Sequence, residues 1–169
     1  IGSNTTSLKG SWERLDNFQN YKRSRGMLSS KELYVGLDGS PAPGALKRFD
    51  GCWHDAFVNQ TVDDVATVIK HGQEIWFGGF SKKYGASVWR GDGYSFEKVG
   101  HWKGFFGVPS LCSHGGVVFA ALAPFSKNQL GAPIMAFDGQ WCDIYSDHRY
   151  LCVYDMQVHN GNLYLATYG

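Results

Sequence analysis

Three histidines stand at matching places in the sequence. His71, His114 and His159 each open a short polar segment that contains Gly or Asn, at intervals of 43 and 45 residues. If the units that carry them surround a common axis, three imidazoles converge on one face, where they could hold a transition metal with open coordination positions. No carboxylate recurs beside them, and the remaining unit has Ser29 at this place. We therefore predict neither a metal nor a cofactor, and keep the histidines as an alternative metal site.

A second group of chemically useful residues lies in the segments 16–25, 58–64, 99–106 and 146–151. Aromatic rings are interleaved there with Arg, Lys, Asp and His. This mixture suits a glycan or a polar protein surface, because rings stack on apolar faces while charged groups fix hydroxyls. The candidate ligand-binding residues are Arg23, Arg25, Asp64, His101, Trp102, Lys103, His148, Arg149 and Tyr150. Alternatively, the rings close one end of the core and the charges are simply solvated.

No motif for an activated nucleophile is found. The sequence lacks GxSxG, HExxH, a Walker loop and a DxDxDG calcium loop. Asp63 and Asp64 form an acidic pair without a general acid that we can assign. We predict no catalytic residues, and whether the chain is an enzyme stays open, with a non-catalytic role favoured.

A repeat of about 43 residues must position these side chains. Four apolar pairs follow one another at steps of 42, 43 and 45 residues: Leu33-Tyr34, Ile75-Trp76, Val118-Phe119 and Leu163-Tyr164. A polar turn precedes each pair, and in three units an Asp-Gly turn follows it, then an aromatic residue: Trp53, Phe96 or Trp141. Asp-Gly between apolar runs is a strong hairpin signal, because tight hairpin turns need positive φ. Each unit is therefore predicted to form four antiparallel strands.

Such a sheet has two apolar faces and two open edges, so it needs neighbours. A radial arrangement supplies them, which predicts a single all-β domain over residues 1–169, a β-propeller of four antiparallel four-stranded blades. The blades are expected at about 26–58, 65–99, 107–146, and 152–169 combined with 1–15. The last is completed by strands from both ends of the chain. Alternatives are a four-blade excerpt of a larger propeller and completion of the split unit by neighbouring copies.

Two motifs carry a resemblance to a known family. An apolar triplet runs into a double glycine in "IWFGG" (75–79), and an aromatic-Asp-Gly turn is followed by Trp in "RFDGCW" and "AFDGQW". This pattern resembles kelch-type propeller repeats and, more distantly, short-repeat lectin propellers. The double glycine occurs in the second unit alone. The resemblance implies the propeller fold and does not extend to a particular function.

The inner strand of each blade carries one polar residue at a matching position. Eight residues before the apolar pairs stand Arg25, Thr67, Ser110 and Asp155. Alternation along a strand predicts that they point into the central channel. We expect Arg25 and Asp155 to form an ion pair that plugs the channel, or alternatively to guard a site for a small ligand.

Composition narrows the possible partners. The chain has 16 Lys and Arg against 15 Asp and Glu, so there is no electrostatic case for nucleic acid, and its longest apolar run is far too short to cross a membrane. Two glycosylation sequons, at Asn4 and Asn59, favour an extracellular, cell-surface or virion-surface location. The four cysteines show no metal-site spacing, although Cys142 and Cys152 could pair.

From these observations we predict a non-catalytic recognition or adhesion module. It would bind a glycan or a protein surface through its loop face, as part of a larger assembly or a homo-oligomer. One alternative is a propeller enzyme, either metal-dependent through the axial histidines or acting on saccharides. The other is a structural oligomeric spacer.

Overall fold

The computed structural model describes residues 18–39, 43–126 and 131–168 of the chain. Within these ranges the regular structure is antiparallel β-strand. None of the described residues belongs to a helix long and apolar enough to cross a membrane.

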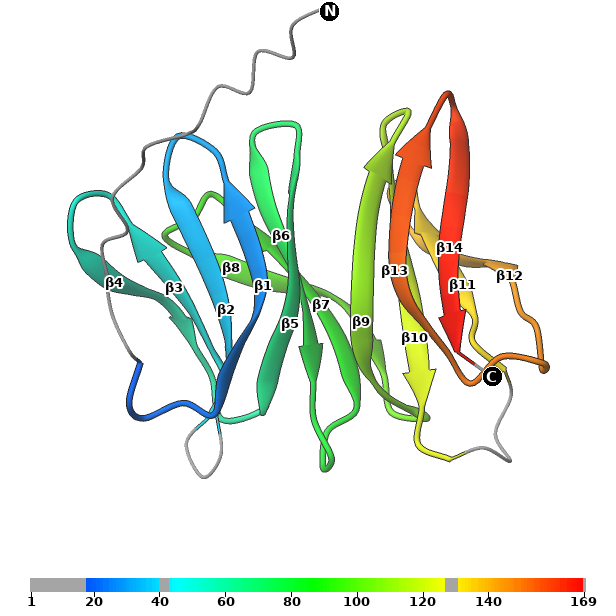
Figure 1. The fold of residues 1–169 in the computed structure, drawn as a ribbon, viewed down its shortest axis with the longest axis horizontal. Coiled ribbons are helices and arrows are strands. Elements are labelled where there is room, and N and C mark those ends of the chain that lie inside the picture. Colours follow the sequence, from blue (N-terminus) through cyan, green and yellow to red (C-terminus); the bar gives the residue numbers. More distant parts are fainter. Residues whose placement is uncertain (1–17, 40–42, 127–130, 169) are drawn as a thin grey trace, which may run out of the picture.

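Three four-stranded antiparallel sheets and one hairpin follow one another along the chain (Figure 1). The first sheet consists of β1 (Arg23–Ser29), β2 (Leu33–Asp38), β3 (Ala45–Phe49) and β4 (Trp53–Val58). The second consists of β5 (Asp64–His71), β6 (Glu74–Phe80), β7 (Ala86–Gly91) and β8 (Phe96–Trp102). The third consists of β9 (Phe105–His114), β10 (Val117–Pro124), β11 (Ile134–Phe137) and β12 (Trp141–Tyr145). The hairpin is β13 (Cys152–His159) with β14 (Asn162–Tyr168).

The Asp-Gly turns join the two outer strands of each sheet, as predicted. Gly51, Gly93 and Gly139 have φ of 118°, 95° and 118°, a region that side-chain-bearing residues rarely adopt. The turn brings the last residue of one strand opposite the aromatic that opens the next, and Phe49 pairs with Trp53 in this way.

The sheets are arranged as the blades of a β-propeller. The inner strands β1, β5, β9 and β13 pack against one another in this order, while β4, β8 and β12 form the outer edges (Figure 1). Single bridges between Asp38 and Asp64 and between Phe80 and Gly107 link consecutive sheets at one end. The expected all-β, antiparallel propeller fold is therefore confirmed.

The core fills the spaces between consecutive sheets. One apolar cluster lies between the first and second sheets, another between the second and third, and another between the third sheet and the hairpin. Small residues allow the sheets to approach. A Cβ on Gly36 would lie 2.4 Å from the carbonyl oxygen of Val65, and one on Gly78 would lie 2.8 Å from the side chain of Val108. The double glycine of the second unit thus serves packing between sheets.

Two segments that lie outside the expected blade bounds are partly strand. The segment 16–25 was expected to be a linker, but β1 begins at Arg23. The segment 99–106 was expected to be a long connection, but β8 continues to Trp102 and β9 begins at Phe105. The strands continue because Trp102 and Phe105 pack against the core cluster between the second and third sheets.

The fourth unit is a two-stranded hairpin within the described residues. The strands expected from residues 1–15 lie outside them, so its completion by both ends of the chain stays a prediction. Among the tyrosines of the hairpin, Tyr154, Tyr164 and Tyr168 are exposed. All four cysteines are free, including Cys142 and Cys152.

Candidate functional site

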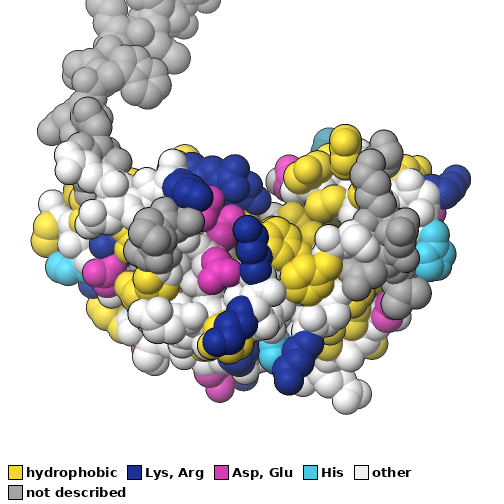
Figure 2. All heavy atoms as spheres, turned by 90° about the horizontal axis from the view of Figure 1, so that it is seen from below, with side chains coloured by type: hydrophobic (Ala, Val, Ile, Leu, Met, Phe, Trp, Pro, Cys, Tyr) yellow, Lys and Arg dark blue, Asp and Glu magenta, His cyan; other side chains and the backbone are white. Residues whose placement is uncertain are grey.

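A cleft of about 600 Å³ opens where the inner strands begin, between β1 and β13. It lies on the face of the connections that lead into the inner strands. One wall comes from the first two sheets and carries the charged residues Lys22, Arg23, Arg25, Asp38, Asp63, Asp64 and Lys82. The other surfaces are mainly apolar, and Figure 2 shows charged side chains gathered beside a hydrophobic area on this face.

The repeat explains why the cleft opens at this junction. At the other three junctions the inner strand presents a buried valine to the preceding sheet: Val65, Val108 or Val153. The equivalent position of β1 holds Arg23, whose side chain is 58% exposed. A guanidinium cannot enter an apolar interface without a large desolvation cost, so the space here stays open to solvent.

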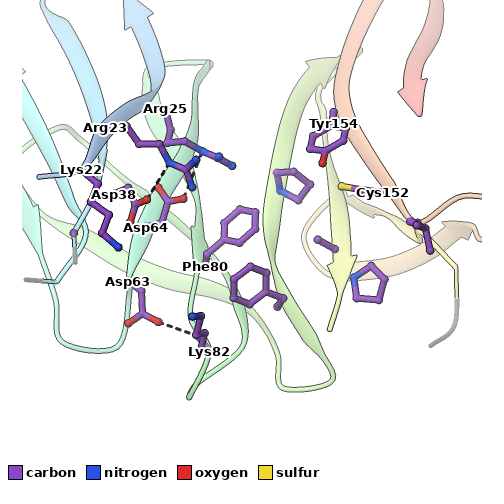
Figure 3. A pocket seen from close by; sticks show the side chains of 16 residues that line it. Lys22, Arg23, Arg25, Asp38, Asp63, Asp64, Phe80, Lys82, Cys152 and Tyr154 are labelled. Carbon is purple, nitrogen blue, oxygen red and sulfur yellow. Dashed lines mark hydrogen bonds and ion pairs between the residues drawn. The ribbon is translucent and has the colours of Figure 1, made fainter. Parts of the chain in front are cut away.

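Ion pairs hold the charged wall in place (Figure 3). Arg23 Nε donates to Asp38 Oδ2 at 3.0 Å, and Arg25 Nε lies 3.5 Å from Asp64 Oδ2. Asp63 Oδ2 accepts the backbone N–H of Lys82 at 2.9 Å. The carboxylates come from the ends of β2 and the start of β5, which the bridge between Asp38 and Asp64 brings together.

Asp64 is the most buried of these carboxylates. The residue is 7% exposed, and its Oδ1 atom has no hydrogen-bond partner among the residues that the structure describes. Burial raises the pKa of Asp64 to about 6, an effect that Arg25 opposes and Asp38 reinforces. The group therefore titrates close to neutral pH, between a protonated donor and a carboxylate.

Aromatic rings lie both beside the charged wall and across the cleft from it. Phe80 and Phe106 meet edge to face, with ring centroids 5.1 Å apart. The guanidinium of Arg25 lies 5.7 Å from the centroid of Phe80. Across the cleft, Tyr154 of β13 is 60% exposed and faces the charged wall (Figure 3). A ligand in the cleft thus meets aromatic rings and charged groups close together.

Three of the nine candidate ligand-binding residues line this cleft: Arg23, Arg25 and Asp64. His101, Trp102 and Lys103 do not. The ring of Trp102 packs edge to face on Trp141, with centroids 5.1 Å apart, and His101 Nε2 contacts the carbonyl oxygen of Tyr84 at 2.7 Å. Lys103 is exposed in the turn between β8 and β9.

The other three candidates lie in the connection before β13, also outside the cleft lining. Arg149 forms an exposed pair with Asp147, with Nη2 and Oδ2 2.6 Å apart. The hydrogen bonds from Arg149 lower the pKa of Asp147 and hold the connection in a tight turn. Tyr150 packs on the core cluster beside the hairpin, and His148 is exposed. A role for these residues in binding stays a prediction.

The repeat contained a signal that would have identified further cleft residues. Asp38, Phe80 and Ala123 stand five residues after the start of their apolar pairs, and all three line the cleft. The ends of the second strands build the cleft as much as the connections between units do. Tyr154 had no comparable signal.

The described histidines do not form the alternative metal site. His71 Nδ1 lies 2.7 Å from Ser113 Oγ, and His159 packs beside Tyr164. In the described ranges, one group of three His, Cys, Asp or Glu residues has ligand atoms within 4.8 Å of one another, and it includes none of His71, His114 and His159.

The ion pair expected in the channel is also wrong. Arg25 is paired with Asp64, while Asp155 accepts a hydrogen bond from Ser110 Oγ at 3.4 Å. Thr67 Oγ1 accepts the backbone N–H of Leu111. Three of the four inner polar residues, Thr67, Ser110 and Asp155, therefore form hydrogen bonds between neighbouring inner strands. The fourth, Arg25, pairs with Asp64 and lines the cleft.

Comparisons with known proteins show the fold alone. No family model and no curated protein matches the chain. The computationally designed protein Ika4 has a TM-score of 0.61 at 14% identity, over 94% of this chain and 100% of Ika4. The designed protein Ika8 has a TM-score of 0.58 at 15% identity, over 85% of this chain, which spans 42% of Ika8. Both are designed propellers.

An α-L-arabinofuranosidase from Clostridium thermocellum, CtGH43, is also similar, with a TM-score of 0.49 at 12% identity over 86% of this chain and 60% of the enzyme. The strand arrangement and the likeness to the two designed proteins show an all-β propeller fold. The resemblance to kelch repeats stays an interpretation of the sequence.

Proposed function

We propose that the protein binds a saccharide in the cleft between β1 and β13. The observation that carries this proposal is the pairing of a charged wall with aromatic rings in one cleft of about 600 Å³. Saccharides present apolar faces that stack on rings and hydroxyls that pair with carboxylates and guanidinium groups. The volume falls in the usual range for small-ligand sites, roughly 300–1,000 Å³.

The cleft is suited to recognising a ligand, because most of its charged side chains are held in place by ion pairs with one another. Arg23 is paired with Asp38 and Arg25 with Asp64, so the groups are positioned before a ligand arrives. Fixed side chains lose little conformational entropy on binding, which improves affinity.

The test uses two exposed tyrosines of the same hairpin. Tyr154 lines the cleft and Tyr164 does not, and they are 60% and 55% exposed. After a glycan array identifies a bound saccharide, Tyr154→Ala is expected to weaken binding by about tenfold, equivalent to about 1.4 kcal/mol. Tyr164→Ala is expected to bind as the wild type does. No saccharide binding, or equal loss in both variants, would contradict the proposal.

A second candidate function is saccharide hydrolysis, favoured by the carboxyl pair of the cleft. Asp64 has a pKa of about 6, while Asp38 is paired with Arg23. Glycosidases use one protonated and one ionised carboxyl group across the scissile bond. Hydrolysis requires that the bound saccharide be cleaved and that Asp64→Asn stop cleavage without loss of binding. Binding without cleavage leaves recognition as the function.

A further inference from the structure

The hairpin between β3 and β4 brings three different metal-ligand types together: Asp50, Cys52 and His54. His54 Nε2 lies 3.0 Å from Asp50 Oδ1 and 3.2 Å from Cys52 Sγ. The sulfur and the carboxylate oxygen are 3.8 Å apart. All three residues are exposed, and none of them lines the saccharide cleft.

Hydrogen bonding alone does not account well for this arrangement. Both neighbours approach the same imidazole nitrogen, and a hydrogen on Nε2 points in one direction within the ring plane. Directed at the carboxylate of Asp50, it does not account for the contact of 3.2 Å between Nε2 and the sulfur of Cys52, whose thiol is left with a long hydrogen bond of 3.8 Å to Asp50 Oδ1. Without that hydrogen, the nitrogen and the carboxylate oxygen are two acceptors 3.0 Å apart.

A metal ion satisfies all three atoms at once. Bonds of about 2.0–2.3 Å to oxygen, nitrogen and sulfur in a tetrahedral site place the ligand atoms roughly 3.3–3.8 Å from one another. The three observed separations agree with these values to within a few tenths of an ångström. The fourth position would face solvent.

A buried arginine orients the carboxylate. Arg48 is 7% exposed, and its Nη2 lies 3.4 Å from Asp50 Oδ2 while its Nη1 lies 3.0 Å from Glu32 Oε1. It holds the outer oxygen of Asp50 and leaves Oδ1 facing the other two ligands. Supporting contacts of this kind fix ligand orientation in metal sites.

The repeat does not explain Cys52 and His54. Asp-Gly and the following aromatic recur in other units, because Asp-Gly forms the hairpin turn and the aromatic packs between the sheets. In the third sheet the places of Cys52 and His54 hold Gln140 and Cys142. Cys142 Sγ instead donates to the carbonyl oxygen of Ala136 at 3.6 Å. The three-ligand set is thus particular to the first sheet.

We propose that Asp50 Oδ1, Cys52 Sγ and His54 Nε2 bind a divalent transition metal of the zinc class. Thiolate and imidazole select such ions over Ca²⁺ and Mg²⁺, which take oxygen ligands. Cys52 binds as the thiolate and releases its proton to solvent. This site is separate from the saccharide cleft and does not depend on its function.

The test titrates Co²⁺, a spectroscopic substitute for Zn²⁺, into the reduced full-length chain. A thiolate-to-cobalt charge-transfer band is expected to appear and saturate, and added Zn²⁺ is expected to remove it. Cys52→Ser abolishes the band, and His54→Gln weakens Co²⁺ binding at least tenfold. Cys142→Ser, the matched variant of the other exposed hairpin cysteine, leaves the band unchanged.

A second measurement follows thiol alkylation by mass spectrometry. Zn²⁺ is expected to slow the reaction of iodoacetamide with Cys52 at least tenfold and to leave that of Cys142 unchanged. The proposal is overturned if the wild type gives no band, if Cys52→Ser keeps it, or if Zn²⁺ protects both cysteines equally.

Discussion

Asp64 carries its charge in a place where that charge is poorly solvated. Its ordinary pKa of 3.8 is raised to about 6, first by burial. Between about pH 4 and pH 6 the folded chain binds a proton that the unfolded chain releases, so the free energy of unfolding falls as pH rises through this window. Above pH 6 Asp64 is charged, and its burial then lowers the free energy of unfolding by the full amount, at most about 3 kcal/mol.

We therefore expect Asp64→Asn to stabilise the protein at neutral pH. The amide carries no charge to desolvate. The free energy of unfolding of the variant should therefore be about 2 kcal/mol higher than that of the wild type at pH 7.5. The advantage should shrink between pH 6 and pH 4, because the wild-type carboxyl is protonated there. Urea unfolding across this pH range measures the difference. A difference that does not change with pH would show that burial does not perturb Asp64.

At the residue scale, sequence patterns selected part of the lining of the cleft. Arg25 and Asp64 were selected because charged residues beside aromatic rings suit ligand binding, and both line the cleft. Trp102 and Arg149 fitted the same pattern, yet one packs on Trp141 and the other pairs with Asp147. Composition alone does not reveal whether a ring or a charge already has a partner within the chain.

At the element scale, small residues decide how closely consecutive sheets approach. Gly36, Gly78 and Ala121 occupy the same place in the second strand of their units. Each lies opposite the inner strand of the next unit, where Val65, Val108 or Val153 fills the space. The motif that resembles a kelch double glycine thus has a packing reason.

We expect Gly36→Ala to be strongly destabilising. Its Cβ would lie 2.4 Å from the carbonyl oxygen and 2.9 Å from Cγ1 of Val65, so the first two sheets must separate. The expected loss is about 2–4 kcal/mol of unfolding free energy. Gly104→Ala is the control, because no described residue other than its chain neighbours has an atom within 4 Å of its Cβ position. Chemical unfolding of both variants tests this, and equal stability would contradict the packing account.

The repeat predicted the strands and hairpins well, because turns and apolar pairs are local signals in the sequence. Asp-Gly turns and the apolar pairs marked the hairpins of all three complete sheets. Connections were less predictable: the segment 99–106 reads as a loop by composition, but its aromatics belong to strands that pack on the core. Tertiary packing, which the local pattern does not contain, decided its conformation.

On the scale of the whole molecule, the cleft lies at the junction between the first sheet and the fourth unit, of which the described residues supply two strands. Three junctions are closed by valines, whereas Arg23 stands at the fourth. Phase along the sequence predicts a strand from residues 1–15 for the fourth unit, but it cannot distinguish a strand of the same chain from one of a second copy. Both arrangements satisfy the same spacing.

Two equivalent tryptophans test whether the fourth sheet is completed. Trp141 Nε1 donates to the carbonyl oxygen of Val99 at 2.8 Å, which joins the third sheet to the outer strand of the second. Trp53 occupies the same place in the first sheet, but its Nε1 is buried and has no partner among the described residues. An unpaired buried donor costs about 1–3 kcal/mol. We therefore predict that the strand expected from residues 1–15, which lie outside the described residues, supplies its acceptor.

If so, Trp53→Phe and Trp141→Phe should cost similar amounts, about 2 kcal/mol each, because each removes a hydrogen bond and the same ring area. Urea unfolding of the two variants measures this, at several protein concentrations. Stability independent of concentration indicates that the strand comes from the same chain, and concentration dependence indicates a second copy. If Trp53→Phe is neutral or stabilising while Trp141→Phe is costly, no acceptor reaches Trp53, and the fourth sheet is not completed on that side.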